Sequence, residues 1–242
     1  GAIYKNKKIG SFGHISTWSF CQDKIISTGG EGGMISTNNK RLWLKCWSLK
    51  DHGKNYKSVF NKKHKIGFKW LHDDFGSNYR MTEMQAVIGK EQLKLLDKQI
   101  EKRNVIANLY LDGLKDYFFK YDFLKKQDFK CQTCPLKENL KECNKCIHAF
   151  YRLNLFINKN KINQNKLILK LNERKINCGV GPCPEIYREK IFKKMKLSPK
   201  KRLPNAKLLG ETSLSFPINP NKTSKQVMYE INVIKKILDK FI

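Results

Sequence analysis

The sequence contains little arginine, few acidic residues and no long hydrophobic run. Only seven of its 49 basic residues are arginine. All 49 basic residues together, against 21 acidic residues, give a net charge of +28. No segment approaches the roughly 18 consecutive apolar residues that a membrane-spanning helix needs. Neither end carries a basic segment followed by an apolar one and a small-residue cleavage site, so no signal peptide is visible. We therefore expect a soluble, cytoplasmic protein without membrane association.

The positive charge is spread along the chain and is not gathered in one motif. Lysine is interleaved with asparagine and isoleucine over nearly the whole length. A nucleic-acid-binding protein more often concentrates its charge on one face and uses arginine for bidentate contacts. We attribute the charge to a compositional bias and expect no nucleic-acid partner. A basic, zinc-containing nucleic-acid-binding protein is the alternative class.

The order of predicted elements favours an α/β organisation. The 242 residues, 40% of them apolar, are enough for a buried core in one or two domains. Helix starts are indicated by two capping boxes, Thr82 with Gln85 and Thr223 with Gln226. Strands are expected at 15–22, 34–37, 148–157 and 211–218, helices at 40–53, 82–116, 162–175 and after 223, and a long loop at 54–75. Because strands alternate with helices, we expect a mixed α/β first part at 1–116 and a smaller α+β domain at 117–242.

One lysine lies in a setting unlike the others. Lys24 follows a predicted strand that contains Ser19, and the glycine-rich segment STGGEGG comes directly after it. Hydroxyl groups and glycine N–H groups at the end of a strand are suited to hold a phosphate. A lysine beside such a turn can hold pyridoxal 5′-phosphate (PLP) as a Schiff base. From spacing alone, a solvated surface charge is the competing interpretation of Lys24.

A longer stretch of sequence makes the cofactor interpretation more specific. GSFGHISTWSFCQDKIISTGGEGGMISTNN resembles the cofactor-lysine segment of the DegT/StrS family of PLP-dependent sugar aminotransferases. Further blocks follow in the same order, DHG (51–53), GSNYRMTEMQAVIGKEQLKLLDKQIEKRNVIANLY (76–110), HAFYRL (148–153) and LPNAKLLGETSLSFPINP (203–220). The resemblance implies the type I PLP-transferase fold, with part of a large domain (mixed sheet with helices) at 1–116 and a small C-terminal α+β domain.

The resemblance also implies roles for individual residues. Lys24 matches the lysine that holds PLP covalently and moves a proton at the substrate carbon, and Ser19 matches a serine that binds the cofactor phosphate. Asn78 matches an asparagine that reaches this phosphate from the neighbouring subunit, which implies a homodimer with a shared site. Tyr79 and Arg80 would lie near that interface. We expect Lys24, Ser19 and Asn78 to form the cofactor site.

The family further implies the reaction. We expect the transfer of an amino group, with glutamate as the donor, to a nucleotide-linked keto-sugar used for cell-surface polysaccharides or amino sugars. A sugar dehydratase on the same scaffold is the related alternative, but that variant carries histidine where this chain has Lys24.

Some features depart from the family pattern. His14 stands where the family has an acidic residue, and STGGEGG contains one glycine more than the common form. The family's phosphate turn and the aspartate that pairs with the pyridine nitrogen would precede Gly1. We therefore expect this chain to be the back part of a longer enzyme and to bind cofactor weakly by itself.

The segment at about 126–147 is a cysteine-rich insert outside the family pattern. Cys131, Cys134, Cys143 and Cys146 have the spacing C-x2-C-x8-C-x2-C, which allows either a structural zinc site or free thiols. No catalytic metal is expected. Glu185 and Tyr187, further on, are candidates either for substrate contact or for a structural position at the rim.

Overall fold

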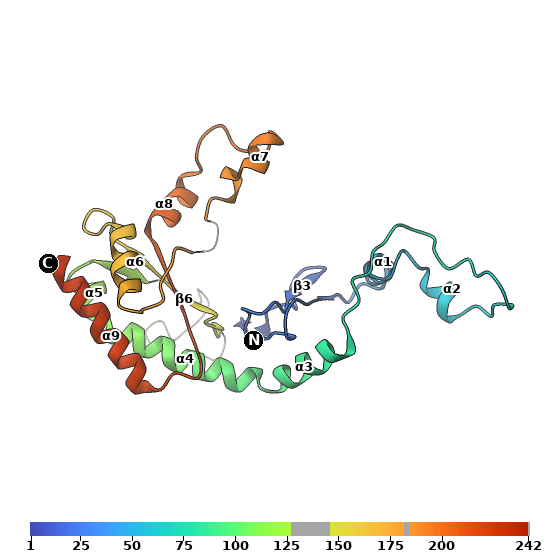
Figure 1. Ribbon diagram of the computed structural model, residues 1–242, viewed down its shortest axis with the longest axis horizontal. Coiled ribbons are helices and arrows are strands. Elements are labelled where there is room, and N and C mark those ends of the chain that lie inside the picture. Colours follow the sequence, from blue (N-terminus) through green and yellow to red (C-terminus); the bar gives the residue numbers. More distant parts are fainter. Residues whose placement is uncertain (127–145, 182–183, 242) are drawn as a thin grey trace. The chain divides into compact units, whose positions relative to one another are not determined.

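The computed structural model describes residues 1–126, 146–181 and 184–241 and forms two compact units (Figure 1). The first unit consists of residues 1–97 with 146 and 147, and the second contains the other described residues from Lys98 onward. Every buried hydrophobic residue of the described chain, from Ile100 to Leu238, belongs to the second unit. Within the same residues, no helix is both long and apolar enough to cross a bilayer.

The first unit is built on two antiparallel hairpins. β1 (Ile3–Tyr4) pairs with β2 (Lys7–Lys8), and β3 (Ser16–Ser19) pairs with β4 (Gly33–Ser36). In the second hairpin Ser19 lies opposite Gly33, so that the segment from 20 to 32 forms the connection. The predicted strand at 15–22 is confirmed in a shorter form, and the one at 34–37 is confirmed one residue earlier in the sequence. The hairpin thus brings the serine and the lysine of the predicted site into one connected segment.

Three helices follow in the first unit: α1 (Lys40–Lys50), α2 (Tyr56–Phe60) and α3 (Glu83–Lys94). The side chain of Asn39 caps α1 by accepting hydrogen bonds from the backbone of Arg41 and Leu42. The capping box predicted at the start of α3 is present, with Thr82 and Gln85 each bonding the other's backbone. The prediction of a long loop at 54–75 is confirmed for 61–75 but is wrong at 56–60, where α2 forms with the Asn55 side chain as its cap.

The predicted long helix at 82–116 is divided. α3 ends at Lys94 and α4 (Leu96–Gly113) begins after Leu95, whose N–H bonds the carbonyl of Gln92, three residues back. This tighter hydrogen bond interrupts the regular four-residue series of an α-helix. A second interruption at Leu114 separates α4 from α5 (Lys115–Phe119).

The second unit contains a three-stranded antiparallel sheet in the order β5-β6-β7. Its strands are β5 (Leu124–Lys126), β6 (Arg152–Ile157) and β7 (Ser213–Pro217). Burial alternates along β6, where Leu153, Leu155 and Ile157 are buried and the residues between them are half-buried. This two-residue period is the pattern of a strand with one face on a core. The strand predictions at 148–157 and 211–218 are confirmed in a shorter form, at 152–157 and 213–217.

Helices of the second unit complete its core. α6 (Gln164–Glu173) contributes Leu167 and Leu171, and α9 (Ser224–Leu238) contributes five buried residues at helical spacing, followed by the short η2 (Asp239–Phe241). α4 and α9 approach closely, because a Cβ on Gly113 would lie 2.8 Å from the side chain of Ile231. The predicted capping box of Thr223 with Gln226 opens α9.

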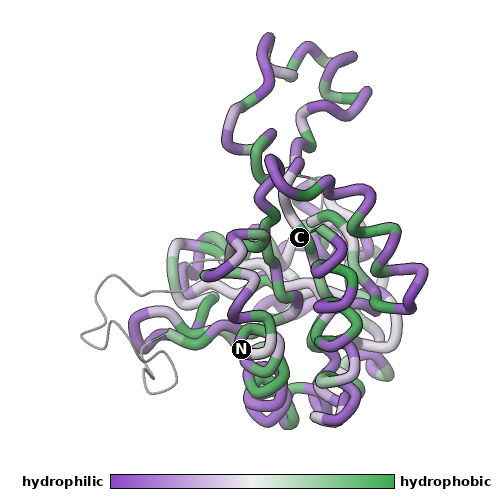
Figure 2. The backbone as a smooth tube through the Cα atoms, turned by 90° about the vertical axis from the view of Figure 1, so that its left-hand side faces the viewer, coloured by the Kyte–Doolittle hydropathy of each residue, from purple (hydrophilic) through white to green (hydrophobic). Residues whose placement is uncertain are grey.

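An excursion of the chain precedes β7. It contains η1 (Ile186–Arg188) and α7 (Lys190–Lys194), and it returns through α8 (Pro204–Thr212). None of these three helices was predicted from the sequence. Around α7, at the top of Figure 2, the tube is coloured mostly as hydrophilic, in accordance with its many lysines. We call residues 185–203 the α7 arm.

Candidate functional site

The β3–β4 hairpin fixes the backbone on either side of Lys24. The N–H of Phe20 bonds Gly32 O at 2.7 Å, and the N–H of Thr28 bonds Phe20 O at 3.1 Å. These bonds continue the hairpin one step beyond β3 and then turn the chain back. The N–H of Lys24 bonds Cys21 O at 3.1 Å, so Lys24 lies in a tight turn directly after the strand. Its backbone is therefore well defined although the segment contains little regular structure.

The ammonium group of Lys24 lies beside a carboxylate. Its Nζ is 3.0 Å from Oδ1 of Asp23, and about 36% of the Lys24 side chain is exposed. Cys21 Sγ donates a hydrogen bond to the same Asp23 oxygen at 2.7 Å. Ser19 Oγ accepts a long hydrogen bond of 3.5 Å from the N–H of Cys21. The turn thus presents a hydroxyl, a thiol, a carboxylate and an accessible amine within six residues.

The glycine segment after Lys24 packs tightly against α3. Thr28 is buried, and a Cβ on Gly89 of α3 would lie 3.0 Å from its methyl group. A Cβ on Gly32 would lie only 2.3 Å from Thr28 Oγ1, which explains why a glycine stands there. Gln85 of α3 donates from Nε2 to the carbonyl of Glu31 at 2.8 Å. Glycine at position 32 is therefore required by the packing of this segment, whether or not a ligand binds there.

The third predicted site residue, Asn78, lies on a different segment of the same unit. Asp51 and Asn78 form an isolated antiparallel bridge, and the N–H of His52 bonds Ser77 O at 3.2 Å. Gly53 has a φ of +74°, and a Cβ there would lie 1.7 Å from Asp74 O. The two sequence blocks DHG and GSNYR are therefore one structural element, which requires glycine at its crossing point.

Side chains of this element form a charged cluster around Arg80. Arg80 donates from Nε to Asn78 Oδ1 at 2.9 Å, and one of its terminal nitrogens lies 3.9 Å from Asp51 Oδ1. Lys54 Nζ is 3.0 Å from the same Asp51 oxygen, and this hydrogen bond is the largest contribution that lowers the pKa of Asp51. The cluster holds Asn78 in a defined orientation at an exposed position.

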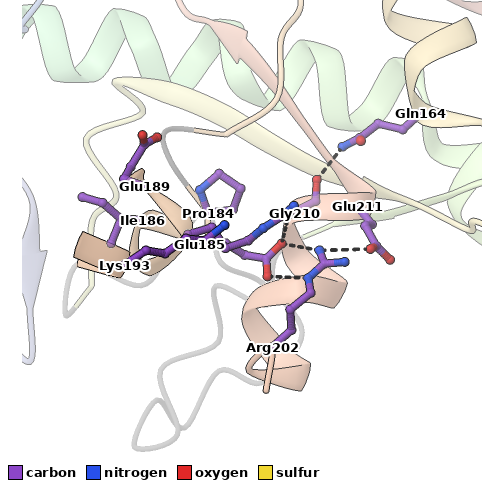
Figure 3. Close-up of a pocket in the computed structure, with 10 residues that line it drawn as sticks. Gln164, Pro184, Glu185, Ile186, Glu189, Lys193, Arg202, Gly210 and Glu211 are labelled. Atoms are coloured by element: carbon purple, nitrogen blue, oxygen red, sulfur yellow. Dashed lines mark hydrogen bonds and ion pairs between the residues drawn. The ribbon is translucent and has the colours of Figure 1, made fainter. Parts of the chain in front are cut away.

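The second unit has a shallow cavity of about 510 Å³ beside the α7 arm, and Glu185, one of the two residues considered as substrate contacts, lines it (Figure 3). Arg202 donates from Nε to Glu185 Oε1 at 2.9 Å and bonds Oε2 with a second nitrogen. Arg188 reaches Oε2 at 3.1 Å, and the hydroxyl of Tyr187 donates to Oε1 at 2.6 Å. The Arg202 hydrogen bonds, followed by that of Tyr187, lower the pKa of Glu185 to about 2.

These contacts give Glu185 and Tyr187 a structural position. The Tyr187 hydroxyl also accepts from the N–H of Leu203 at 3.0 Å, so the two ends of the α7 arm are joined. Arg202, the residue that completes this junction, was missed in the sequence. Its signal was the scarcity of arginine, because a chain with seven arginines among 49 basic residues uses them where a planar, bidentate donor is needed.

The proposed zinc ligands lie mostly outside the described residues. Cys131, Cys134 and Cys143 are not described, and Cys146 is half-buried at the edge of the first unit. Elsewhere in the described chain, no group of three or more His, Cys, Asp or Glu side chains is arranged to hold a metal ion. Zinc binding by the insert stays a prediction.

With this geometry established, comparison with known proteins identifies the family. The model of the DegT/DnrJ/EryC1/StrS aminotransferase family matches residues 1–237. The chain belongs to this family. GDP-perosamine synthase of Escherichia coli O157:H7 is 30% identical over 233 residues, which cover 95% of this chain and 53% of that protein.

Two further relatives support the assignment. A UDP-4-amino-4,6-dideoxy-N-acetyl-beta-L-altrosamine transaminase of Campylobacter jejuni (serotype O:23/36) is 31% identical over 169 residues, 63% of this chain and 42% of that protein. A solved aminotransferase from Psychrobacter cryohalolentis is 38% identical and superposes with a TM-score of 0.87, covering 100% of this chain and 60% of that one. The predicted α/β PLP-transferase fold class is confirmed. The aligned part of the chain covers between 42% and 60% of the length of these relatives.

Proposed function

We propose that this chain carries the lysine-bearing part of a PLP-dependent aminotransferase that acts on a nucleotide-linked keto-sugar. Two observations support the proposal: the family membership over residues 1–237, and an accessible amine at Lys24 in a turn held by the β3–β4 hairpin. Relatives named as GDP-perosamine synthase and as a UDP-amino-sugar transaminase support the class of substrate. Glutamate is the proposed amino donor.

The residues of the turn suit this cofactor chemically. PLP carries an aldehyde, which a primary amine can bind covalently, and a phosphate, which hydroxyl and amide donors can bind. Lys24 supplies the amine and Ser19 the hydroxyl. Gly33, which lies opposite Ser19 in the hairpin, leaves no side chain beside that hydroxyl. The donor set therefore fits the cofactor.

In the proposed mechanism, each of these residues has one task. Ser19 Oγ and Asn78 Nδ2 would donate to the cofactor phosphate, Asn78 from the partner subunit of a homodimer. Lys24 Nζ would hold the cofactor through its aldehyde, and the same amine would take and return the proton at the substrate carbon. When bound, PLP supplies an electron sink for the negative charge that develops there.

The experiment uses the complete protein, incubated with PLP and then treated with borohydride to make the bond permanent. Peptide mapping by mass spectrometry should locate the adduct on Lys24. Lys24→Ala should abolish the adduct, whereas Lys45→Ala, an exposed lysine on α1, should leave it unchanged. An adduct that persists in Lys24→Ala would refute the assigned role of Lys24.

A second measurement tests the reaction. Nucleotide-linked keto-sugars and glutamate are supplied together, and the products are examined for an amino group. Amination supports the proposal, and loss of a hydroxyl without amination would indicate a dehydratase. Modified Lys24 without either product would contradict the proposed class of substrate.

A further inference from the structure

The orientation of the Asn78 carboxamide is determined by its neighbour. Asn78 Oδ1 accepts from Arg80 Nε at 2.9 Å and from the backbone N–H of Arg80 at 3.4 Å. The oxygen and nitrogen of an asparagine amide are exchangeable by a flip, but arginine has only donors. The oxygen must therefore face Arg80, and the two Nδ2 hydrogens must point away from it. Since Asn78 is exposed, they are available to an acceptor from outside this element.

Arg80 is itself held by acceptors on the facing segment. One terminal nitrogen lies 3.9 Å from Asp51 Oδ1, and the other lies 3.4 Å from His52 Nε2. Asp51 is only 14% exposed and is kept ionised by Lys54. The backbone at His52 is left-handed, with a φ of +58°, and its ring contacts Arg80. The Asn78 amide oxygen, the Asp51 carboxylate and the His52 ring thus lie around one guanidinium, and few of its orientations keep all three contacts.

We propose that Arg80 is a positioning residue that fixes the amide of Asn78 so that its Nδ2 hydrogens face the cofactor phosphate. The inference rests on the proposed function, which assigns the phosphate to Asn78. Without Arg80 the amide could turn its oxygen toward the phosphate, and two electronegative groups would then meet. Arg80 therefore acts through Asn78 on the phosphate and has no effect on the covalent bond at Lys24.

A double-mutant cycle separates this role from direct contact between Arg80 and the phosphate. Dissociation constants for PLP and for pyridoxal, which lacks the phosphate, are measured on the complete protein with Arg80→Ala, Asn78→Ala and both changes. Each single variant should weaken PLP about tenfold, equivalent to about 1.4 kcal/mol for a charge-assisted hydrogen bond, and should leave pyridoxal unchanged. The double variant should bind PLP no more weakly than Asn78→Ala alone.

The outcomes are distinguishable. Additive losses in the double variant would overturn the positioning role, because Arg80 would then act on the ligand directly. Equal losses for PLP and pyridoxal would also overturn it, since they would indicate general damage. If Arg80→Ala fails to fold, Arg80→Lys takes its place. Because lysine keeps the charge and a donor, this variant should retain part of the wild-type affinity for PLP. Arg41→Ala is the control and should bind PLP as the wild type does. If the wild-type protein forms no adduct at Lys24, the proposed function itself fails; an unchanged PLP preference with that adduct intact rejects only this inference.

Discussion

Lys24 Nζ and Asp23 Oδ1 lie 3.0 Å apart, so the amine proposed to bind the cofactor is paired with the carboxylate of the residue before it. The same oxygen accepts from Cys21 Sγ, which anchors the carboxylate at the base of the turn. The ion pair holds Nζ against Asp23, so this contact has to open before the amine can reach an aldehyde. Asp23 is therefore expected to slow the reaction of Lys24.

Asp23→Asn should make Lys24 more reactive. Loss of the carboxylate removes the ion pair that holds Nζ, so the amine meets the reagent more readily, and because the pair is partly exposed, the rate should rise only about two- to fivefold. The rate is measured by acylating the protein at neutral pH and following the Lys24 peptide by mass spectrometry. Asp23→Glu should behave as the wild type, and equal rates in Asp23→Asn and wild type would show that the ion pair has no effect on the amine.

Gly32→Ala should disrupt the segment that follows Lys24. The added Cβ would lie 2.3 Å from Thr28 Oγ1, and Thr28 is buried against α3, so the loop has to shift. Overpacking of this kind costs about 1–3 kcal/mol. The yield of the borohydride-reduced adduct at Lys24 should fall at limiting PLP. Gly179→Ala is the matched control, since its Cβ would have no neighbour within 4 Å, and a full yield in Gly32→Ala would contradict the packing role.

Local signals in the sequence predicted local structure well. Both capping boxes and the two strands β3 and β4 were recognisable, because each is determined by residues a few positions apart. The break at Leu95 was not, because leucine is a good helix former and nothing in its side chain marks the change of hydrogen bonding. The short α2 was missed because its signal is weak: its cap is a single asparagine in a segment of mixed composition.

The contacts of the site were less accessible to prediction. Arg80 meets His52 across 28 residues and Arg202 meets Glu185 across 17, and one sequence carries no record of such pairs. Composition offered one clue, the rarity of arginine. Three of the seven arginines, Arg80, Arg103 and Arg202, each donate to two or more acceptors in the structure. In a lysine-rich chain, arginine therefore marks positions where donor geometry is important.

Leu171→Ala should destabilise the second unit strongly. Leu171 is 1% exposed in the core between α6 and the sheet, and truncation of a buried leucine costs about 2–5 kcal/mol. Leu169→Ala, two residues away on the same helix, is the control because its side chain is 63% exposed and should lose less than about 1 kcal/mol. Urea unfolding followed by circular dichroism measures both. Similar losses in the two variants would contradict the assigned core.

The junction at the base of the α7 arm should make stability depend on acid. The pKa of Glu185 is lowered from its ordinary value of 4.5 to about 2, first by the Arg202 hydrogen bonds and then by that of Tyr187. A carboxyl group with a lowered folded-state pKa stabilises the fold above its unfolded pKa, and this stability is lost as the pH falls toward the folded value. Between pH 4.5 and 2 the wild type should therefore lose a contribution that Glu185→Gln does not possess.

The comparison is a double difference, because other carboxylates also titrate in this range. Urea midpoints are measured at pH 7 and pH 3 for the wild type, for Glu185→Gln and for Glu173→Gln, an exposed carboxylate at the end of α6. The drop from pH 7 to pH 3 should be clearly smaller in Glu185→Gln and about equal to the wild type in Glu173→Gln. Three equal drops would mean that the carboxylate joined to Arg202, shown in Figure 3, does not stabilise the folded arm.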